Sequence, residues 1–375
     1  MKIGVPREVQ PGETRVALTP SSIPALKKKG HEVHVEAGAG GASFLSDEQY
    51  EKAGATVVKT PRDMYDAVDV VFKVQSPAKE EAGMLREGTA LIGFLAPFTH
   101  VDMIRILVER RITSFSMEFV PRITRAQSMD ALSSMATLAG YKAVLMAADR
   151  LPRMFPLLTT AAGTIAPATV LVLGAGVAGL QAIATAKRLG ARVEAFDPRP
   201  GVKEQVESLG ASFVAMETLE DVQTAVGYAK EQSEDFLRRE RETIAARLPK
   251  CDVVITTAQV FGKRAPLLIT ENMIKLMPRG SVLIDLAAEQ GGNCELTKAN
   301  EAVEKDGVVI HGAVNLPATL PMNASQMYAK NVTTLFDHLY KDPAKGLDFE
   351  DEITRSACVT HDGQIRNEAV RQAVG

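Results

Sequence analysis

A cluster of polar side chains that could hold a ligand occurs in the stretch PRITRAQSMDALSS. Its members are Arg122, Gln127, Asp130 and Ser133. The run Ser114–Val120 before it predicts a strand, and the run Ala131–Leu151 after it predicts a long helix. The carboxyl end of a strand that leads into a helix is where α/β proteins place ligand contacts. The alternative is an ion pair between Arg122 and Asp130 beside a helix cap, because Asp and Ser are favoured at that position.

A glycine-rich turn further along has the spacing G-x-G-x-x-G. Its glycines are Gly174, Gly176 and Gly179. An apolar strand pattern precedes them, a helical pattern follows, and a second strand pattern ends at Asp197. This order predicts a dinucleotide site, in which the second glycine lets the backbone approach a diphosphate at the helix start. A glycine-rich turn without a ligand is the alternative.

Asp197 indicates which dinucleotide would bind. Its carboxylate would accept hydrogen bonds from the adenosine ribose and would repel a 2′-phosphate, which favours NAD(H) over NADP(H). Arg199 lies close enough to offset part of that repulsion.

Length and composition exclude several classes of protein. A chain of 375 residues predicts two domains. A net charge of -3 and the absence of Trp argue against nucleic-acid binding. The three Cys form no C-x-x-C pair and the six His no ligand cluster, so we expect no metal site and a reducing cytoplasm. We find no signal peptide and no apolar run long enough to span a bilayer, so we expect a soluble chain.

Strand and helix patterns alternate in two series, which predicts an α/β fold with two Rossmann-like domains, mostly parallel sheets and a cleft between them. The expected domains are 1–130 with 322–375, and 131–321 with the linking helix. The charged stretch Leu219–Arg247 predicts one long exposed helix or a helix with a mobile loop. The expected strands are 2–5, 32–36, 55–58, 69–74, 89–95 and 114–120 in the first series, and 168–174, 191–197, 251–257, 280–287 and 307–312 in the second.

Two long motifs carry a resemblance to a known family. GVPREVQPGETRVALTPSSIPAL (4–26) and LVLGAGVAGLQAIATAKRLGA (171–191) resemble the signatures shared by alanine dehydrogenase and the alpha subunit of proton-translocating NAD(P) transhydrogenase. The resemblance covers nearly the whole chain. It implies two Rossmann-like domains with a cleft, and NAD bound to the second domain facing that cleft.

Three segments resemble the transhydrogenase branch. PRITRAQSMDALSS is similar to its Arg-Gln-Asp loop, which reaches the nicotinamide end of NAD(H). GYAKEQSEDFLRRE (227–240) is similar to its mobile loop, with Tyr228 able to close over the nucleotide or to pack on its own helix. IDLAAEQGGNCEL (284–296) also resembles the transhydrogenase form.

Two departures from alanine dehydrogenase agree with that assignment. The dehydrogenase has a His just after the strand that corresponds to 90–95, whereas here His100 comes several residues later. It also has an Asp where this chain has Glu289. Arg15 and Lys73 do match its substrate-binding Arg and Lys, although Arg15 could instead cap a turn and Lys73 mark a strand end facing solvent.

The resemblance implies direct hydride transfer between NAD(H) here and NADP(H) on a partner subunit, coupled to proton translocation. Deamination needs a tuned acid or base, whereas transfer between two nicotinamides moves only hydride. Gln127, Arg122 and Asp130 would serve the transfer. The residues expected to bind the cofactor are Gln127, Asp130, Ser133, Gly174, Gly176, Val177, Gly179, Asp197, Pro198, Arg199, Gly227, Tyr228, Ala258 and Gln259.

The resemblance also implies partners: a second copy of the chain, an NADP(H)-binding subunit and a transmembrane subunit. The chain ends at Gly375 without membrane helices, so we expect a split-subunit form attached to the cytoplasmic face of the inner membrane through its partners. One rival is an alanine dehydrogenase-like amino-acid oxidoreductase. The other is an NAD-binding regulatory module that transfers no hydride.

Overall fold

The chain folds into two compact units. The structure is a computed structural model that describes residues 1–216, 233–260, 262–342 and 346–374. Unit 1 combines Met1–Met135 with Pro317–Gly375, and unit 2 comprises Ala136–Leu316. The two junctions lie within a long helix and a 3-10 turn, a few residues from the bounds expected at 130/131 and 321/322.

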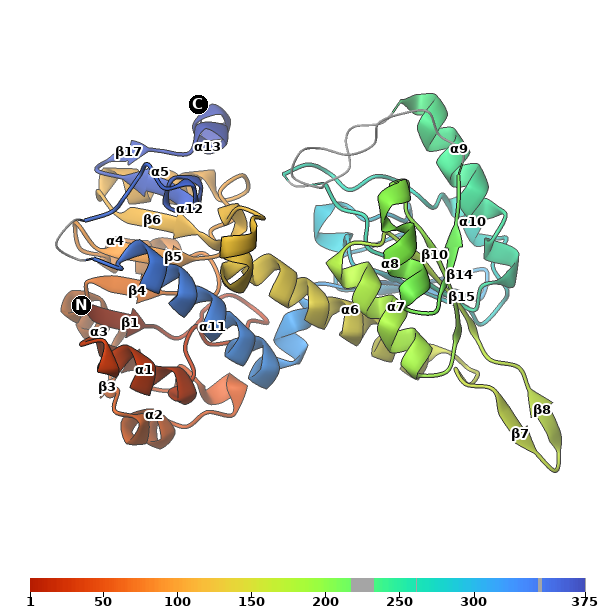
Figure 1. Cartoon of the computed structure of the whole chain (residues 1–375), viewed down its shortest axis with the longest axis horizontal. Helices are drawn as coiled ribbons and strands as arrows, with labels where there is room; N and C mark the ends of the chain where they lie inside the picture. Colours follow the sequence, from red (N-terminus) through yellow and green to blue (C-terminus); the bar gives the residue numbers. More distant parts are fainter. Residues whose placement is uncertain (217–232, 261, 343–345, 375) are drawn as a thin grey trace. The chain divides into compact units, whose positions relative to one another are not determined.

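Unit 1 is built on one sheet with the strand order β17-β16-β6-β5-β4-β1-β2-β3 (Figure 1). Strands β1 to β6 pair in parallel, and β16 and β17 add antiparallel at the β6 edge. The sheet is therefore mostly parallel, as the alternating patterns predicted. The bounds are Lys2–Val5 (β1), Glu32–Glu36 (β2), Thr56–Val58 (β3), Val70–Phe72 (β4), Ala90–Gly93 (β5), Thr113–Ser116 (β6), Cys358–His361 (β16) and Gln364–Ile365 (β17).

Helices cover both faces of this sheet. The long helix α11 belongs to the C-terminal segment and buries Tyr328, Leu335 and Phe336 in unit 1 (Figure 1). The helices of the unit are Ile23–Lys28 (α1), Asp47–Ala53 (α2), Pro61–Ala67 (α3), Lys79–Met84 (α4), Val101–Glu109 (α5), Pro321–Leu339 (α11), Glu352–Ala357 (α12) and Glu368–Val374 (α13). Its 3-10 turns are Pro20–Ser22 (η1), Gly41–Ser43 (η2), Met117–Phe119 (η3), Thr124–Met129 (η4) and Leu316–Thr319 (η8).

The expected strand 114–120 is wrong in its second half. Strand β6 ends at Ser116, and η3 takes over. The reason is Glu118, whose buried carboxylate accepts N–H bonds from Leu95 and Ala96 in the loop after β5. Because Glu118 must reach that loop, its backbone leaves the ladder.

Unit 2 has the strand order β11-β10-β9-β12-β13-β15-β14, parallel except for the β14–β15 pair. From β9 the chain continues to β10 on one side and to β12 on the other, so the order reverses there. Ligands bind at such a switch point, outside the carboxyl ends of the strands. The bounds are Thr169–Leu173 (β9), Arg192–Phe196 (β10), Ser212–Val214 (β11), Val253–Thr256 (β12), Val282–Asp285 (β13), Ala302–Lys305 (β14) and Val308–Gly312 (β15).

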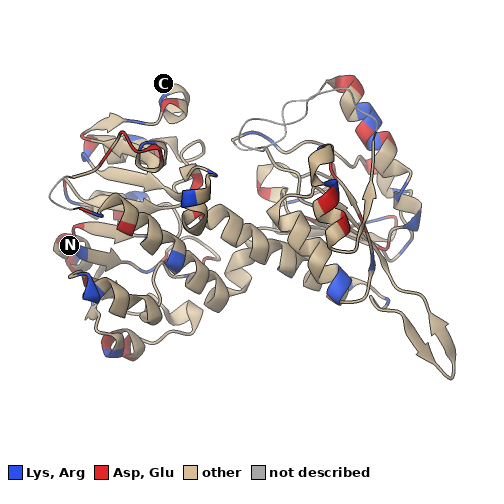
Figure 2. Ribbon diagram, in the orientation of Figure 1, with Lys and Arg blue, Asp and Glu red and all other residues tan. Residues whose placement is uncertain are grey.

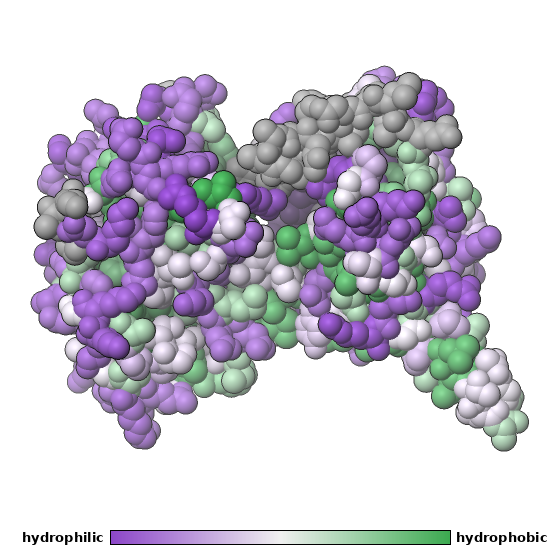
Figure 3. Space-filling model, viewed as in Figure 1, coloured by the Kyte–Doolittle hydropathy of each residue, from purple (hydrophilic) through white to green (hydrophobic). Residues whose placement is uncertain are grey.

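The remaining elements of unit 2 surround this sheet. The helices are Val177–Arg188 (α7), Lys203–Ser208 (α8), Glu234–Ala245 (α9) and Glu271–Ile274 (α10), and the 3-10 turns are Pro200–Val202 (η5), Leu248–Lys250 (η6) and Ala288–Gln290 (η7). A separate hairpin of β7 (Leu158–Thr160) and β8 (Gly163–Ile165) was not expected and projects away from the sheet (Figure 1). Exposed Leu157 and Ile165 give the hairpin region apolar surface (Figure 3).

The charged stretch 219–247 is described only from Ser233 onward. Helix α9 carries alternating charges on its exposed side (Figure 2). It is not exposed throughout, since Phe236, Glu240 and Ile244 recur at helical spacing and are buried. Glu240 is the charged member of that buried face.

Helix α6 (Ala131–Arg150) corrects another expectation. By length and composition it could cross a membrane, although no apolar run was expected to be long enough. Ala143, Val144 and Ala147 of this helix are fully buried in the core of unit 2. This burial is typical of a core helix, so the apolar composition alone is weak evidence for a membrane span.

Candidate functional site

The glycine turn joins β9 to α7, as the motif predicts. Gly174 has φ +100°, a conformation that L side chains rarely adopt. A Cβ on Gly179 would lie 1.8 Å from the carbonyl oxygen of Gly174, so helix and strand can pack this closely only with glycine there. A Cβ on Gly176, the N-cap of α7, would meet nothing within 4 Å. This open side of the turn fits a diphosphate approaching the free N–H groups at the start of α7. Val177 is the first residue of that helix and is partly exposed.

Asp197 follows β10 and is nearly buried. One carboxylate oxygen accepts the N–H of Ala175 in the glycine turn at 2.7 Å. The Arg199 guanidinium donates to both carboxylate oxygens at 2.8 Å, and its backbone N–H donates to one of them at 2.9 Å. The bond to Asp197 raises the pKa of Arg199. Sequence reasoning set Arg199 against Asp197, whereas the structure pairs the two charges across Pro198.

Ala258 and Gln259 follow β12, which lies beside β9. The side chain of Asn293 accepts the N–H of Ala258 at 3.1 Å and donates to its carbonyl at 2.8 Å. Gln259 donates from Nε2 to the carbonyl oxygen of Leu286 at 2.8 Å. The residues expected at Gly174, Asp197 and Ala258 therefore come together at the carboxyl ends of three neighbouring strands.

Sequence reasoning missed the two buried groups that support this edge. Asp285 is fully buried and accepts the N–H groups of Ala287, Asn293 and Cys294 and the hydroxyls of Thr256 and Thr297. Asp285 thus fixes Asn293, which in turn fixes Ala258. The available signal was a carboxylate at the end of the apolar run VLID, which is a typical position for a group that organises loops.

Glu240 brings a second carboxylate toward Asp197. Burial, together with the nearby charge of Asp197, raises the pKa of Glu240 to about 7, against a lowering effect of Arg241. The expected cofactor residues Gly227 and Tyr228, just before this helix, lie outside the described residues.

The Arg-Gln-Asp cluster lies in unit 1, on η4 and its flanks. The carboxylate of Asp130 accepts the hydroxyl of Ser133 at 2.6 Å and its N–H at 2.8 Å, so Asp130 caps α6. The capping alternative is thus present for Asp130 and Ser133. The side chains of Arg122 and Gln127 are exposed, as a ligand contact requires.

Arg15 and Lys73, the positions that match alanine dehydrogenase, are inside unit 1. Arg15 is 3% exposed and donates from Nε and Nη2 to the carboxylate of Glu13 at 2.7 and 2.6 Å. Lys73 is 0% exposed, 2.8 Å from Glu81 and 3.4 Å from Glu8. The reading of Lys73 as a strand end facing solvent is therefore wrong. Burial raises the pKa of Glu8, and the charge of Lys73 partly offsets this. The chain's own carboxylates occupy both cations.

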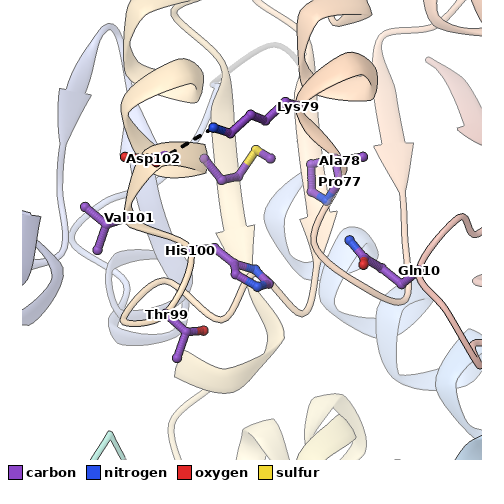
Figure 4. A pocket seen from close by; sticks show the side chains of 9 residues that line it. Gln10, Pro77, Ala78, Lys79, Thr99, His100, Val101 and Asp102 are labelled. Atoms are coloured by element: carbon purple, nitrogen blue, oxygen red, sulfur yellow. Dashed lines mark ion pairs between the residues drawn. The ribbon is translucent and has the colours of Figure 1, made fainter.

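The position that follows β5 carries no acid or base. Ala96 has φ +44°, and its N–H donates to Glu118 at 2.8 Å. His100 instead lines a cavity of about 350 Å³ between the starts of α4 and α5, where Lys79 and Asp102 lie 3.8 Å apart (Figure 4). No group of three or more His, Cys, Asp or Glu placed to hold a metal ion occurs among the described residues.

Comparison with known proteins gives a consistent result. The families described as "Alanine dehydrogenase/PNT, N-terminal domain" and "Alanine dehydrogenase/PNT, C-terminal domain" match residues 4–139 and 143–368. The first part of "NAD(P) transhydrogenase subunit alpha" of Rhodospirillum rubrum, a separate chain there, is 47% identical over 379 residues, covering 99% of each chain. The transhydrogenase structure from Sinorhizobium meliloti is 41% identical with a TM-score of 0.86, covering 98% of this chain and 100% of that one. An L-alanine dehydrogenase structure is 27% identical with a TM-score of 0.85, covering 100% and 99%.

Proposed function

This chain belongs to the alanine dehydrogenase/PNT family, and from that premise we propose that it is the NAD(H)-binding subunit of a proton-translocating NAD(P) transhydrogenase. Hydride passes directly between the nicotinamide of NAD(H) on this chain and that of NADP(H) on a partner subunit. The relatives named transhydrogenase, at 47% and 41% identity, support this branch over the alanine dehydrogenase at 27%.

One observation carries the choice of reaction. Ala96 occupies the position after β5 where alanine dehydrogenase has a His, and its methyl group can neither give nor take a proton. Oxidative deamination needs such a group, whereas transfer between two nicotinamides needs only position and a dry environment. The pairing of Arg15 with Glu13 and of Lys73 with Glu81 and Glu8 agrees, because these carboxylates already neutralise the cations that a keto acid would need.

The residues of the glycine turn fit NAD(H). Gly176 leaves room for the diphosphate at the start of α7, and Asp197 offers carboxylate oxygens toward the adenosine ribose. The bound dinucleotide supplies the hydride. Gln127 orients the nicotinamide by amide hydrogen bonds, Arg122 and Ser133 add donors, and Asp130 shapes the loop by capping α6.

The proposal includes its partners and its location. The chain pairs with a second copy, for which the apolar surface near the β7–β8 hairpin is suited. It assembles with an NADP(H)-binding subunit and a transmembrane subunit at the cytoplasmic face of the inner membrane, and hydride transfer there is coupled to proton translocation. The name of the Rhodospirillum rubrum relative, which is one portion of a subunit alpha, supports a multi-subunit assembly.

The decisive experiment compares three reactions of the purified chain. NADH binding is followed by fluorescence, NADH oxidation is measured with pyruvate and ammonium, and hydride transfer is measured after adding the NADP(H)-binding subunit loaded with NADP⁺. We expect binding, no oxidation by pyruvate and ammonium, and transfer with the partner. Steady oxidation without the partner would establish the amino-acid dehydrogenase instead. Binding without transfer in the complete assembly would leave the regulatory module.

A further inference from the structure

The loop that carries Gln127 is held from outside by the C-terminal segment of unit 1. The side chain of Asn331 on α11 donates from Nδ2 to the carbonyl oxygen of Ser128 at 2.9 Å. The guanidinium of Arg125 is paired with the carboxylate of Asp351 at the start of α12. Gln127 lies between these two anchored residues of η4.

Asp351 is a junction of three segments. Its second carboxylate oxygen is 2.7 Å from Nε2 of His338 on α11 and accepts the N–H groups of Ile353 and Thr354 at 3.0 and 3.2 Å. The side chain is only 10% exposed, whereas that of Arg125 is 51% exposed. Burial alone would raise the pKa of Asp351, but the bonds from Arg125 and His338 lower it, so the anchor stays ionised.

Asn331 serves the loop at a cost. It is 5% exposed, and its Oδ1 is buried without a hydrogen-bond partner among the described residues. A buried unpaired acceptor is destabilising, and an apolar side chain of similar volume would avoid it. The amide is oriented by its one bond, from Nδ2 to Ser128, which indicates that this contact with η4 is its role.

We propose that Asp351 and Asn331 are positioning residues that hold Gln127 of η4 in place for hydride transfer. This inference rests on the proposed function. The two contacts fix the chain on both sides of Gln127, and small displacements of an orienting group cost a large part of the rate. Neither residue belongs to the glycine turn of unit 2, so NAD(H) affinity should depend little on them.

The variants separate positioning from folding. Asp351→Ser keeps a good N-cap for α12 but removes the partner of Arg125 and His338. Asn331→Leu keeps the volume and removes the bond to Ser128. Arg125→Met removes the ion pair from the loop side, and Arg125→Lys restores a cation. The matched control is Asp337→Ser on α11, which breaks the 2.6 Å pair with Lys29 rather than a contact with η4.

The readouts are NADH affinity of the full chain and single-turnover hydride transfer in the assembly with the NADP(H)-binding subunit. For Asp351→Ser, Asn331→Leu and Arg125→Met we expect transfer to fall about tenfold while the NADH dissociation constant stays within about twofold. Arg125→Lys and Asp337→Ser should remain near the original rate. Unchanged transfer in Asp351→Ser and Asn331→Leu would overturn the proposal, as would an equal loss in Asp337→Ser.

Hydrogen exchange of the η4 amides gives a readout that does not depend on activity. The N–H groups of Ala126 and Asp130, bonded to Ile123 and Gln127, should exchange faster in the anchor variants and not in Asp337→Ser. If the unsubstituted chain transfers no hydride, the proposed function fails, and exchange still reports whether the anchors hold the loop. Unaltered exchange would show that they do not.

Discussion

Arg199 and Asp197 form a two-point ion pair beside the glycine turn, with both carboxylate oxygens 2.8 Å from the guanidinium. Each charge neutralises the other, and the same carboxylate also accepts the N–H of Ala175. Arg199 is therefore engaged and is not an open receptor for a 2′-phosphate. The preference for NAD(H) follows from this pairing, because only loss of Asp197 would free the guanidinium.

Asp197→Ala should exchange the dinucleotide preference. Losing hydrogen bonds to a charged acceptor, worth about 1.5–3 kcal/mol, should weaken NADH binding roughly tenfold or more. The freed Arg199 should at the same time strengthen NADPH binding. Fluorescence titrations with both dinucleotides measure the ratio. Arg199→Met is the control, because it leaves the carboxylate to repel the 2′-phosphate; an unchanged ratio in Asp197→Ala would assign selectivity to other residues.

Gln127→Asn should cripple hydride transfer and leave NADH binding nearly intact. The shorter side chain withdraws the amide from the nicotinamide, and a displacement of about 1 Å can cost on the order of a hundredfold in rate. Rapid mixing of the assembled subunits measures the transfer. Ser128→Ala is a matched control, since Asn331 contacts only the backbone carbonyl of Ser128. Full transfer by Gln127→Asn would remove the orienting role from this residue.

Gly176→Ala and Gly179→Ala should fail for different reasons. The new methyl at Gly179 would meet the backbone oxygen of Gly174 at 1.8 Å, so α7 must shift and the melting temperature should fall with NADH binding. The methyl at Gly176 has open space, so stability should hold while it obstructs the diphosphate and weakens binding roughly tenfold. Calorimetry and titration of both variants separate the effects. Equal affinity in Gly176→Ala would place the diphosphate elsewhere.

Glu240→Gln should stabilise the chain at pH 8 and have little effect near pH 4. The folded-state pKa of about 7 lies above the ordinary value of 4.5, so the folded chain binds the proton more tightly than the unfolded chain. Stability is then lost as pH rises from about 4.5 to 7, by on the order of 3 kcal/mol. Denaturation across this range measures the difference. Glu242→Gln, on the exposed side of α9, should not reproduce the pH dependence; parallel profiles for Glu240→Gln and the original chain would contradict the burial argument.

The sequence determined the features that depend on local order. The apolar runs before Gly174 and Asp197 form β9 and β10, and the glycine spacing forms the turn and α7, because backbone conformation and side-chain periodicity act over a few residues. The run Ala131–Leu151 likewise gives α6, which ends at Arg150. Short elements such as α3, α4, β11 and the β7–β8 hairpin were missed, since three to seven residues carry little periodic signal.

Only the tertiary structure decided which charges meet. Arg15 and Lys73 could be matched to a substrate site by position, but their pairing with Glu13, Glu81 and Glu8 arises from how β1, β4 and α4 pack. Arg125 finds Asp351 across more than two hundred residues, because α11 returns the C-terminal segment to unit 1. Spacing along the chain specifies turns and helices. The pKa of a buried carboxylate and the anchoring of a loop depend on neighbours that only the folded chain brings within hydrogen-bond distance.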